Sequence, residues 1–196
     1  MVSMKTIKSG FFLFILPLAA VAAVSVGYSK ANGTNQLCEH KYALCTSALC
    51  VPSPEDPTKA ICFCDVEEGP NMSTVPCDSL RPSTDSNGIQ TVYSTFSLKQ
   101  FTQGKMGLKC PDGTPWTWCL NKKCTVDPTD AKKAVCVCDV MRTKEWMTLG
   151  GNCDTATCKT GYWSGAAMSD FDDGVIFLSK ALGIASTPVK WCPASK

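Results

Sequence analysis

Histidine is almost absent from this sequence of 196 residues, and its scarcity restricts the chemistry that the chain can perform. The single histidine, His40, lies beside Glu39 and near Cys38, but a Cys–His nucleophile pair needs a free thiolate within reach. Every cysteine here has a candidate disulfide partner, so we interpret His40 as an exposed loop residue. The nucleophile pattern G-x-S-x-G is also missing, since residues 161–165 resemble it only in their letters. We therefore predict no catalytic residue.

The chain also lacks a long apolar run after its first 31 residues, so no later segment is expected to span a membrane. Within those residues Lys5 and Lys8 precede an apolar stretch, Phe11 to Val26, in the order of a secretory signal. As a helix this stretch would rise ~24 Å, less than the ~30 Å of a bilayer core. Pro17 at its centre also favours a cleaved signal over a retained anchor. We predict a signal peptide at residues 1–31 and a secreted or periplasmic protein.

An excess of basic charge is missing as well. Residues 1–31 contain three lysines and no acid, which leaves 16 basic and 17 acidic residues in the mature chain. Because nucleic-acid binding requires a basic face, we expect no such partner. Two acidic clusters, Asp170–Asp173 and Asp85–Gly88, lack the glutamate that a calcium-binding loop carries at its twelfth position. We interpret them as a helix start and a turn, and we expect no metal and no cofactor.

Cysteine, in contrast, is abundant, with fourteen copies. An even number of cysteines behind a signal sequence is typical of a disulfide framework. The pairs Cys62/Cys64 and Cys136/Cys138 are separated by one residue, whereas zinc ligands are usually separated by two to four. We therefore predict that all fourteen form disulfides: Cys38, Cys45, Cys50, Cys62, Cys64, Cys77, Cys110, Cys119, Cys124, Cys136, Cys138, Cys153, Cys158 and Cys192.

An internal repeat organises these cysteines. When the sequence is shifted by 74 residues, ten of the 22 positions between Cys45 and Val66 are identical, four of them cysteines. Cys38 then corresponds to Cys110 and Cys77 to Cys153, each with a two-residue difference in length. Gene duplication explains this pattern, and repeat detection precedes any other inference about the fold. Each copy has six cysteines, enough for three internal bridges, and Cys158 and Cys192 are expected to bond to each other.

Each copy contains a predicted β-hairpin. Residues 59–66 and 133–140 alternate in the manner of a strand, and turn-forming residues precede them at 54–58 and 127–130. The two cysteines of a Cys-x-Cys strand point to the same face and lie too far apart to bond each other, so each needs its own partner. The earlier strand of each hairpin should contain Cys50 or Cys124, and Pro52 predicts that the first copy's strand is short or at an edge.

Outside the hairpins we expect one strand and one helix. Residues 89–98 alternate and predict a strand between the two copies. Ser169 is a candidate N-cap, and Gly183 is a candidate helix end. The apolar stripe of this helix should pack on the second copy, and it consists of Phe171, Val175, Leu178 and Leu182.

The predicted fold class is α+β, small and disulfide-rich, with two duplicated β-hairpin modules of six cysteines each and one C-terminal helix. The predicted boundaries are a signal peptide at 1–31, a first six-cysteine module at 32–84, a connecting strand segment at 85–106, a second six-cysteine module at 107–157, and a C-terminal helical segment at 158–196 closed by a Cys158–Cys192 bridge.

Aromatic residues provide the candidate binding surface. All five tryptophans lie in the second half of the chain, and such a platform can stack on a sugar ring or a peptide. Filling the core of a small domain is the favoured alternative for these side chains. The candidate surface consists of Trp116, Trp118, Trp146, Tyr162 and Trp163.

Charge and glycosylation patterns add two further hypotheses. Residues 38–77 contain two lysines against six acids, whereas residues 110–153 contain six basic residues against five acids. Either the exposed sides of the copies have diverged, or the copies pack on each other through complementary charges. Asn32 and Asn71 match the N-glycosylation pattern, which matters only in a eukaryotic secretory route.

These observations favour a secreted or periplasmic binding protein without catalytic activity. Its partner would be an extracellular or periplasmic protein or a glycan, recognised through the hairpin tips and the tryptophan-rich second copy, because a rigid disulfide framework loses little entropy on binding. Inhibition of a protease by an exposed turn is one version of this function. The alternatives are a small extracellular hydrolase that uses paired carboxylates, and a structural envelope protein.

Overall fold

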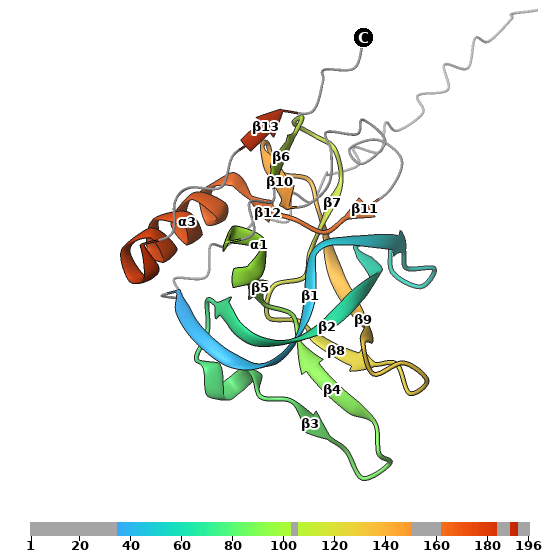
Figure 1. Cartoon of the computed structure of the whole chain (residues 1–196). Helices are drawn as coiled ribbons and strands as arrows, with labels where there is room; N and C mark the ends of the chain where they lie inside the picture. The colour runs from blue at the N-terminus through green and yellow to red at the C-terminus, as the bar shows by residue number, and fades with distance from the viewer. Residues whose placement is uncertain (1–34, 103–105, 150–161, 184–188, 192–196) are drawn as a thin grey trace, which may run out of the picture. The chain divides into compact units, whose positions relative to one another are not determined.

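The computed structural model describes residues 35–102, 106–149, 162–183 and 189–191 (Figure 1). All of these described residues belong to one compact unit. The predicted signal peptide and Cys153, Cys158 and Cys192 lie outside the described residues, so the predicted domain boundaries and the Cys158–Cys192 bridge stay predictions. No helix in the described ranges is long and apolar enough to cross a membrane.

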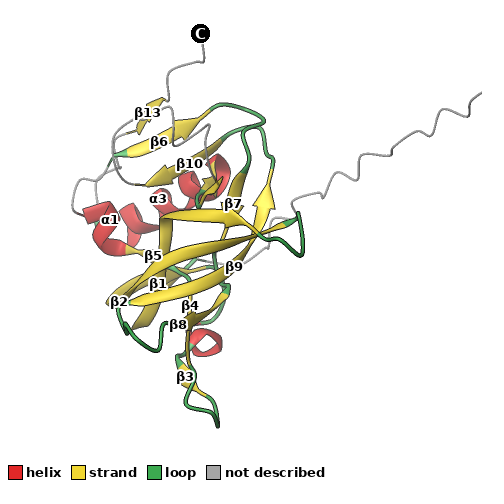
Figure 2. Ribbon diagram, turned by 90° about the vertical axis from the view of Figure 1, so that its right-hand side faces the viewer, coloured by secondary structure: helices red, strands yellow, loops and turns green. Residues whose placement is uncertain are grey.

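The described chain is mostly β-structure, with short helices between strands and one longer helix near the C-terminus (Figure 2). The elements in order are β1 (Gln36–Pro52), β2 (Lys59–Ser73), the 3-10 helix η1 (Cys77–Leu80), β3 (Ser83–Thr84), β4 (Gln90–Tyr93), β5 (Phe96–Ser97), α1 (Leu98–Thr102), β6 (Gly107–Cys110), β7 (Trp116–Trp118), β8 (Lys123–Val126), β9 (Lys133–Met141), β10 (Trp146–Leu149), β11 (Tyr162–Trp163), β12 (Ala166–Ala167), α3 (Met168–Leu182) and β13 (Val189–Trp191).

Two sheets contain these strands. The larger runs β11-β1-β2-β9-β8-β4-β3, with β5 also paired to β2 and β7 to β9. The smaller runs β12-β10-β6-β13, in which β13 is parallel to β6 and the other pairs are antiparallel. Helix α3 lies beside the small sheet and away from the β3–β4 hairpin (Figures 1 and 2). The α+β class therefore fits this mostly β-structure only loosely.

An irregularity in β1 decides which cysteines meet. Leu44 faces Asp65, yet Leu49 faces Phe63, so four residues of β1 oppose Cys64 alone. A bulge of this kind shifts the register downstream of it. Cys50 consequently lies directly opposite Cys62, while Cys45 bonds to Cys64.

The second Cys-x-Cys strand, β9, has the same pattern of bridges. Cys124 lies opposite Cys136 and bonds to it, and Cys119 bonds to Cys138. Strands β2 and β9 thus each form one bridge across 19 residues and one across 12. The prediction that the two cysteines of each Cys-x-Cys strand take different partners is confirmed. Within the described residues there is a fifth bridge, Cys38–Cys77, and Cys110 is disulfide-bonded as well.

The core beneath the large sheet is built mainly from these bridges. Eight bonded cysteines are at most 3% exposed and cluster with small apolar residues such as Ala60 and Ala134. A second cluster lies under α3, where Phe171 and Leu178 pack against Met72, Phe96 and other side chains from both halves of the chain. Cystine sulfur therefore replaces much of the aliphatic bulk that a larger core would contain.

Three local predictions need correction. Pro52 does end β1, but that strand has 17 residues and lies between β11 and β2, so it is neither short nor an edge. The segment predicted as one strand at 89–98 divides into β4 and β5, and Leu98 begins helix α1. Ser169 is not the N-cap, because α3 begins at Met168 after Ala167.

The helix prediction is otherwise partly confirmed. Gly183 ends α3 in the left-handed conformation, at φ 65°, which glycine adopts at little cost. Phe171 and Leu178 of the predicted stripe are buried, and Val175 is partly buried. The prediction that Leu182 belongs to the packed stripe is wrong, since this side chain is 46% exposed. Met72 of β2 also contacts the helix side at Gly174, so α3 packs on both halves of the chain and not on the second copy alone.

Removal of equivalent bridges provides a matched stability test. We predict that replacing Cys50 and Cys62 by alanine lowers the free energy of unfolding by about 3 kcal/mol, from the chain-entropy effect of a short loop. Replacing Cys124 and Cys136 should cost the same within about 1 kcal/mol, because both bridges are buried and span 12 residues. Denaturation in urea measures both values. A loss below about 1 kcal/mol in either variant contradicts the account.

Candidate functional site

The two faces of the β2–β9 pair have different chemistry. Alternation along each strand places Cys62, Cys64, Cys136 and Cys138 on the inner, buried face. The intervening residues point to the outer face. Phe63 and Val137 are each 55% exposed there and Val135 is 39% exposed, although all three are apolar.

These exposed residues continue across neighbouring strands. The pairing register puts Leu49 of β1 beside Phe63, and Phe63 beside Val135. A second row of paired residues runs from Val51 through Ile61 to Val137. We call the six residues of these two rows the outer apolar face: Leu49, Val51, Ile61, Phe63, Val135 and Val137.

Backbone geometry brings the side chains of this face close together. The amide of Val66 donates to Lys132 O and the amide of Val140 donates to Thr58 O, each at 2.8 Å. These bonds make the outer-face pairs of β2 and β9 the non-hydrogen-bonded pairs of the antiparallel ladder, whose Cα atoms lie only about 4.5 Å apart. Neighbouring side chains in such pairs contact each other, so the outer apolar face is continuous. Contiguous exposed apolar surface of this kind marks interaction sites.

Ion pairs border the face at both ends of the strands. Lys59 lies opposite Asp139 and bonds to it, and Lys133 Nζ lies 2.5 Å from Asp65 Oδ1. Lys122 Nζ also reaches Asp139, at 2.7 Å. Among these ion pairs, the hypothesis of complementary charges between the two halves is met by Lys133 with Asp65 alone, since in the other cross-strand pair the lysine comes from the acidic first half.

Asp139 is the most constrained of these groups. Burial alone would raise its pKa, but hydrogen bonds from Lys122 and Lys59 outweigh burial, and the pKa of Asp139 lies below its ordinary value. The same contact raises the pKa of Lys59, through its hydrogen bond to Asp139. Both groups stay ionised at neutral pH, so the ion pair at this end of the face is permanent under ordinary conditions.

Sulfur atoms gather directly beneath the face. Cys45 Sγ lies 3.3 Å from Cys136 Sγ, although each is bonded to a different partner. Two groups of three cysteine sulfurs have the spacing of metal ligands. All six are in disulfides and have no thiolate to offer a metal. These sulfurs are structural, and they make the floor of the face rigid.

The aromatic residues singled out in the sequence divide into buried and accessible groups. Trp116 and Trp146 are fully buried and stack with ring centroids 5.9 Å apart. Trp118 packs edge-on against Trp116. Burial therefore removes Trp116 and Trp146 from the candidate binding surface, as the core-filling alternative requires. Tyr162 and Trp163 are half-buried in β11, where Trp163 pairs with Leu49 at the end of the outer apolar face.

Two polar residues discussed above also need reassignment. His40 is a half-buried strand residue rather than an exposed loop residue, and its Nδ1 lies 3.0 Å from Lys41 O. Asn71 is fully buried and donates to Gly69 O and His40 O. Its amide cannot accept a glycan in the folded state. The other glycosylation pattern, at Asn32, lies outside the described residues.

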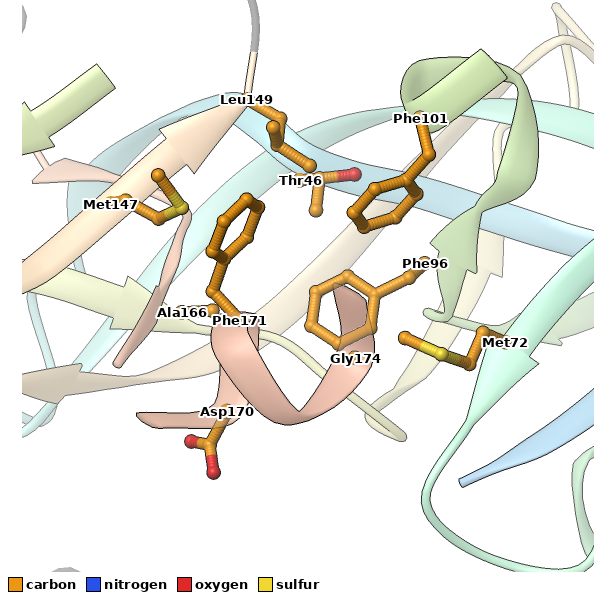
Figure 3. A pocket seen from close by; sticks show the side chains of 10 residues that line it. All are labelled: Thr46, Met72, Phe96, Phe101, Met147, Leu149, Ala166, Asp170, Phe171 and Gly174. Atoms are coloured by element: carbon orange, nitrogen blue, oxygen red, sulfur yellow. The ribbon is translucent and has the colours of Figure 1, made fainter. Parts of the chain in front are cut away.

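The cavity beneath α3 is too small to be a binding site. It has a volume of about 10 Å³, enough for a single water at most. Figure 3 shows the rings of Phe96, Phe101 and Phe171 around it, whereas the Asp170 carboxylate points away from the rings. We interpret this space as a packing gap between the helix and the strands.

A surface groove between two hairpin tips is larger, at about 390 Å³. It lies between the β3–β4 turn and the β8–β9 turn, of which only the β8–β9 turn is one of the hairpin tips predicted from the sequence. Its lining combines polar and apolar groups: Asn87, Gly88, Ile89, Gln90, Thr125, Val126, Asp127, Pro128 and Ala131. This volume is within the range of small-ligand sites.

Comparison with known proteins identified no relative of this chain. No family model matches the chain, and neither the curated proteins nor the solved structures gave a match.

The outer apolar face was missed in the sequence, although a signal for it exists. The segment from Ala60 to Val66 is apolar at six of its seven positions if cysteine is counted, and the only charged residue is Asp65. A strand that is apolar on both faces is usually covered on both sides. The residues that alternate with the cysteines are themselves apolar, and they indicate a second apolar face.

Asp139 provides a test of the ion pairs. We predict that Asp139→Asn lowers the free energy of unfolding by about 1 kcal/mol at pH 7, because two lysines lose their partner. Asp65→Asn is the matched control. Its carboxylate is 56% exposed and has a single lysine partner in the described chain, so its loss should be at most a few tenths of a kcal/mol.

The same variant predicts a pH dependence. A carboxyl with a lowered pKa stabilises the fold above its ordinary pKa, and this contribution disappears as the pH falls through the folded-state pKa. The difference between the native protein and Asp139→Asn should therefore shrink below about pH 4. Urea denaturation from pH 7 to pH 2 measures it, and a constant difference would contradict the assignment.

Proposed function

We propose that this chain is a secreted or periplasmic binding protein without catalytic activity, and that it recognises another protein through the outer apolar face. One observation carries the proposal: Leu49, Phe63 and Val137 are each more than half exposed within one continuous sheet face. The rigid disulfide floor supports it, because a pre-organised surface loses little entropy on binding.

The many disulfides fit an extracellular location, since such bonds persist in oxidising compartments. Export by a signal peptide at residues 1–31 is part of the proposal. Lys5 and Lys8, the apolar stretch from Phe11 to Val26 and the small residues that follow it support this export.

Duplication of one hairpin module is also part of the proposal. The turn before each Cys-x-Cys strand has equivalent backbone bonds: Lys59 donates to Asp56 O at 3.0 Å, and Lys133 donates to Asp130 O at 2.9 Å. The Thr58 and Lys132 amides likewise bond to the carboxylates of Asp56 and Asp130. These bonds, together with the shared disulfide spacing, support two related hairpins joined in one sheet.

The carboxylates support a non-catalytic protein. A glycosidase-like hydrolase needs one carboxylic acid whose pKa is raised so that it can donate a proton. Hydrogen bonds from Thr58 lower the pKa of Asp56, and hydrogen bonds from Thr129 lower that of Asp127. Asp139 is shifted in the same direction by its lysines. These shifts suit turn and ion-pair roles rather than acid catalysis.

A second candidate function is suggested by the groove between the hairpin tips. Its volume of about 390 Å³ and its amide and hydroxyl side chains suit a sugar unit of a glycan. Gln90→Ala and Thr125→Ala in the groove should then lower affinity on a glycan array at least tenfold, with Phe63→Lys as the unaffected control. Unchanged binding in the groove variants would reject this candidate.

Replacement of the apolar side chains on the outer face tests the primary proposal. We predict that Phe63→Lys and Val137→Lys each weaken binding to a protein partner at least tenfold, because each inserts a charge into the centre of the contact. The measurement is capture of the same partner, from the protein's own environment, by the native chain but not by the variants.

The matched controls are Ile176→Lys and Leu182→Lys, at similarly exposed apolar positions on α3. These should capture the partner as the native chain does. Two results would argue against the outer apolar face as the binding surface. One is capture of the partner by Phe63→Lys as strong as by the native chain. The other is a loss of capture in the α3 controls as large as in the Phe63→Lys variant.

A further inference from the structure

The outer face of the β2–β9 pair is an ordered array of charges and apolar groups. Four cross-strand rows follow one another along the strands, with an ion pair at each end and two apolar pairs between them. From one end to the other the rows are Lys59 with Asp139, Ile61 with Val137, Phe63 with Val135, and Asp65 with Lys133.

An approximate two-fold axis relates the strands of this array. The register is centred on Cys62 opposite Cys136, and these two cysteines are themselves 74 residues apart, the repeat offset. Each contact of β2 with β9 therefore has an equivalent contact with the strands exchanged: Lys59 with Asp139, for example, corresponds to Lys133 with Asp65. Such a pairing is isologous, the arrangement found in two-fold dimers.

This symmetry fixes the charges at the four corners of the array. Lys59 and Lys133 occupy diagonally opposite corners, and Asp139 and Asp65 occupy the other two. Two such arrays can be placed face to face by a two-fold rotation about an axis that lies in the face and crosses the strands. Lys59 of one copy then lies over Asp65 of the other, and Asp139 lies over Lys133.

The apolar rows match under the same rotation. Ile61 meets Phe63 of the second copy, and Val137 meets Val135. Leu49 meets Val51 on the flanking strand β1, so all six residues of the outer apolar face find apolar partners. A rotation about an axis along the strands fits less well, because Leu49 would then lie over Thr125 of β8.

We propose that the outer apolar face binds a second copy of this chain, in a face-to-face two-fold dimer whose axis crosses strands β2 and β9. The inference rests on the proposed function and names the partner. Two sheets stacked in this way lie about 10 Å apart with strands aligned within about 30°. A face that is both apolar at its centre and charge-complementary to itself has its best partner in an identical face.

The dimer should be weak. A standard protein interface uses roughly 20–30 residues from each partner, whereas the array and its flanking residues on β1 supply about ten. We therefore expect a dissociation constant on the order of micromolar or weaker. Sedimentation equilibrium of the disulfide-bonded mature protein, over concentrations from about 1 µM to 1 mM, measures it.

Exchange of the charges at one end of the array tests the geometry. The double variant Asp65→Lys with Lys133→Asp keeps an ion pair within its own chain, but in the dimer it places lysine over Lys59 and aspartate over Asp139. The double variant Lys59→Asp with Asp139→Lys does the same at the other end. Each variant alone should dimerise at least tenfold more weakly than the native chain.

An equimolar mixture of the two variants should restore association. In the mixed dimer every lysine again lies over an aspartate, so the dissociation constant should return to within about threefold of the native value. Near-ultraviolet circular dichroism checks that each variant is folded, which matters for Asp139→Lys because Lys122 loses its partner. Restored association also shows that both variants fold.

Three outcomes would overturn the dimer proposal: a native chain that is monomeric up to 1 mM, a single-end variant that dimerises as the native chain does, or a mixture that stays monomeric. The proposed function is judged separately. If the native chain is monomeric but Phe63→Lys still abolishes capture of a different protein, the outer apolar face remains the binding surface and only its occupant is wrong.

Discussion

The antiparallel pairing of β2 with β9, centred on Cys62 opposite Cys136, is the constraint on which the rest of the structure depends. It joins the two cysteine-rich halves of the chain in one sheet and buries four disulfides against each other. Because strand side chains alternate, the same pairing exposes Phe63 and Val137 on the opposite face. The rigid core and the candidate binding surface are therefore two sides of one register.

The register also explains why charged residues border an apolar face. Lys59 and Asp139, and Asp65 and Lys133, lie at the ends of the apolar rows, where they pair across the strands. Cross-strand ion pairs contribute little to stability when exposed, but like charges in the same places would oppose the pairing. Their main effect is to fix which residues face each other, and therefore which apolar groups are neighbours.

Much of the local architecture could be predicted from the sequence. The Cys-x-Cys strands, their separate disulfide partners and the glycine that ends α3 all follow from local rules of alternation and capping. The unequal charges of the two halves suggested contact between them as one of two alternatives, but they did not predict that β2 pairs with β9. The bulge in β1 could not be predicted, because it depends on where Cys45 and Cys50 find their partners.

The candidate site was harder to predict than the fold. Tryptophans drew attention as a binding platform, yet Trp116 and Trp146 fill the interior, where a small domain gains most from large side chains. The residues of the outer apolar face are single positions next to cysteines, and only the strand register brings Leu49, Phe63 and Val135 into one row. Exposure is a property of tertiary packing, and the sequence pattern alone does not specify it.

The most direct test of this account is the β2–β9 register in solution. In a non-hydrogen-bonded antiparallel pair the two α-protons point toward each other, so nuclear Overhauser spectra of the native protein should show strong α-proton cross-peaks. The account predicts these cross-peaks between Ile61 and Val137 and between Phe63 and Val135. Cross-peaks displaced to other partners, or the absence of any between β2 and β9, would contradict it.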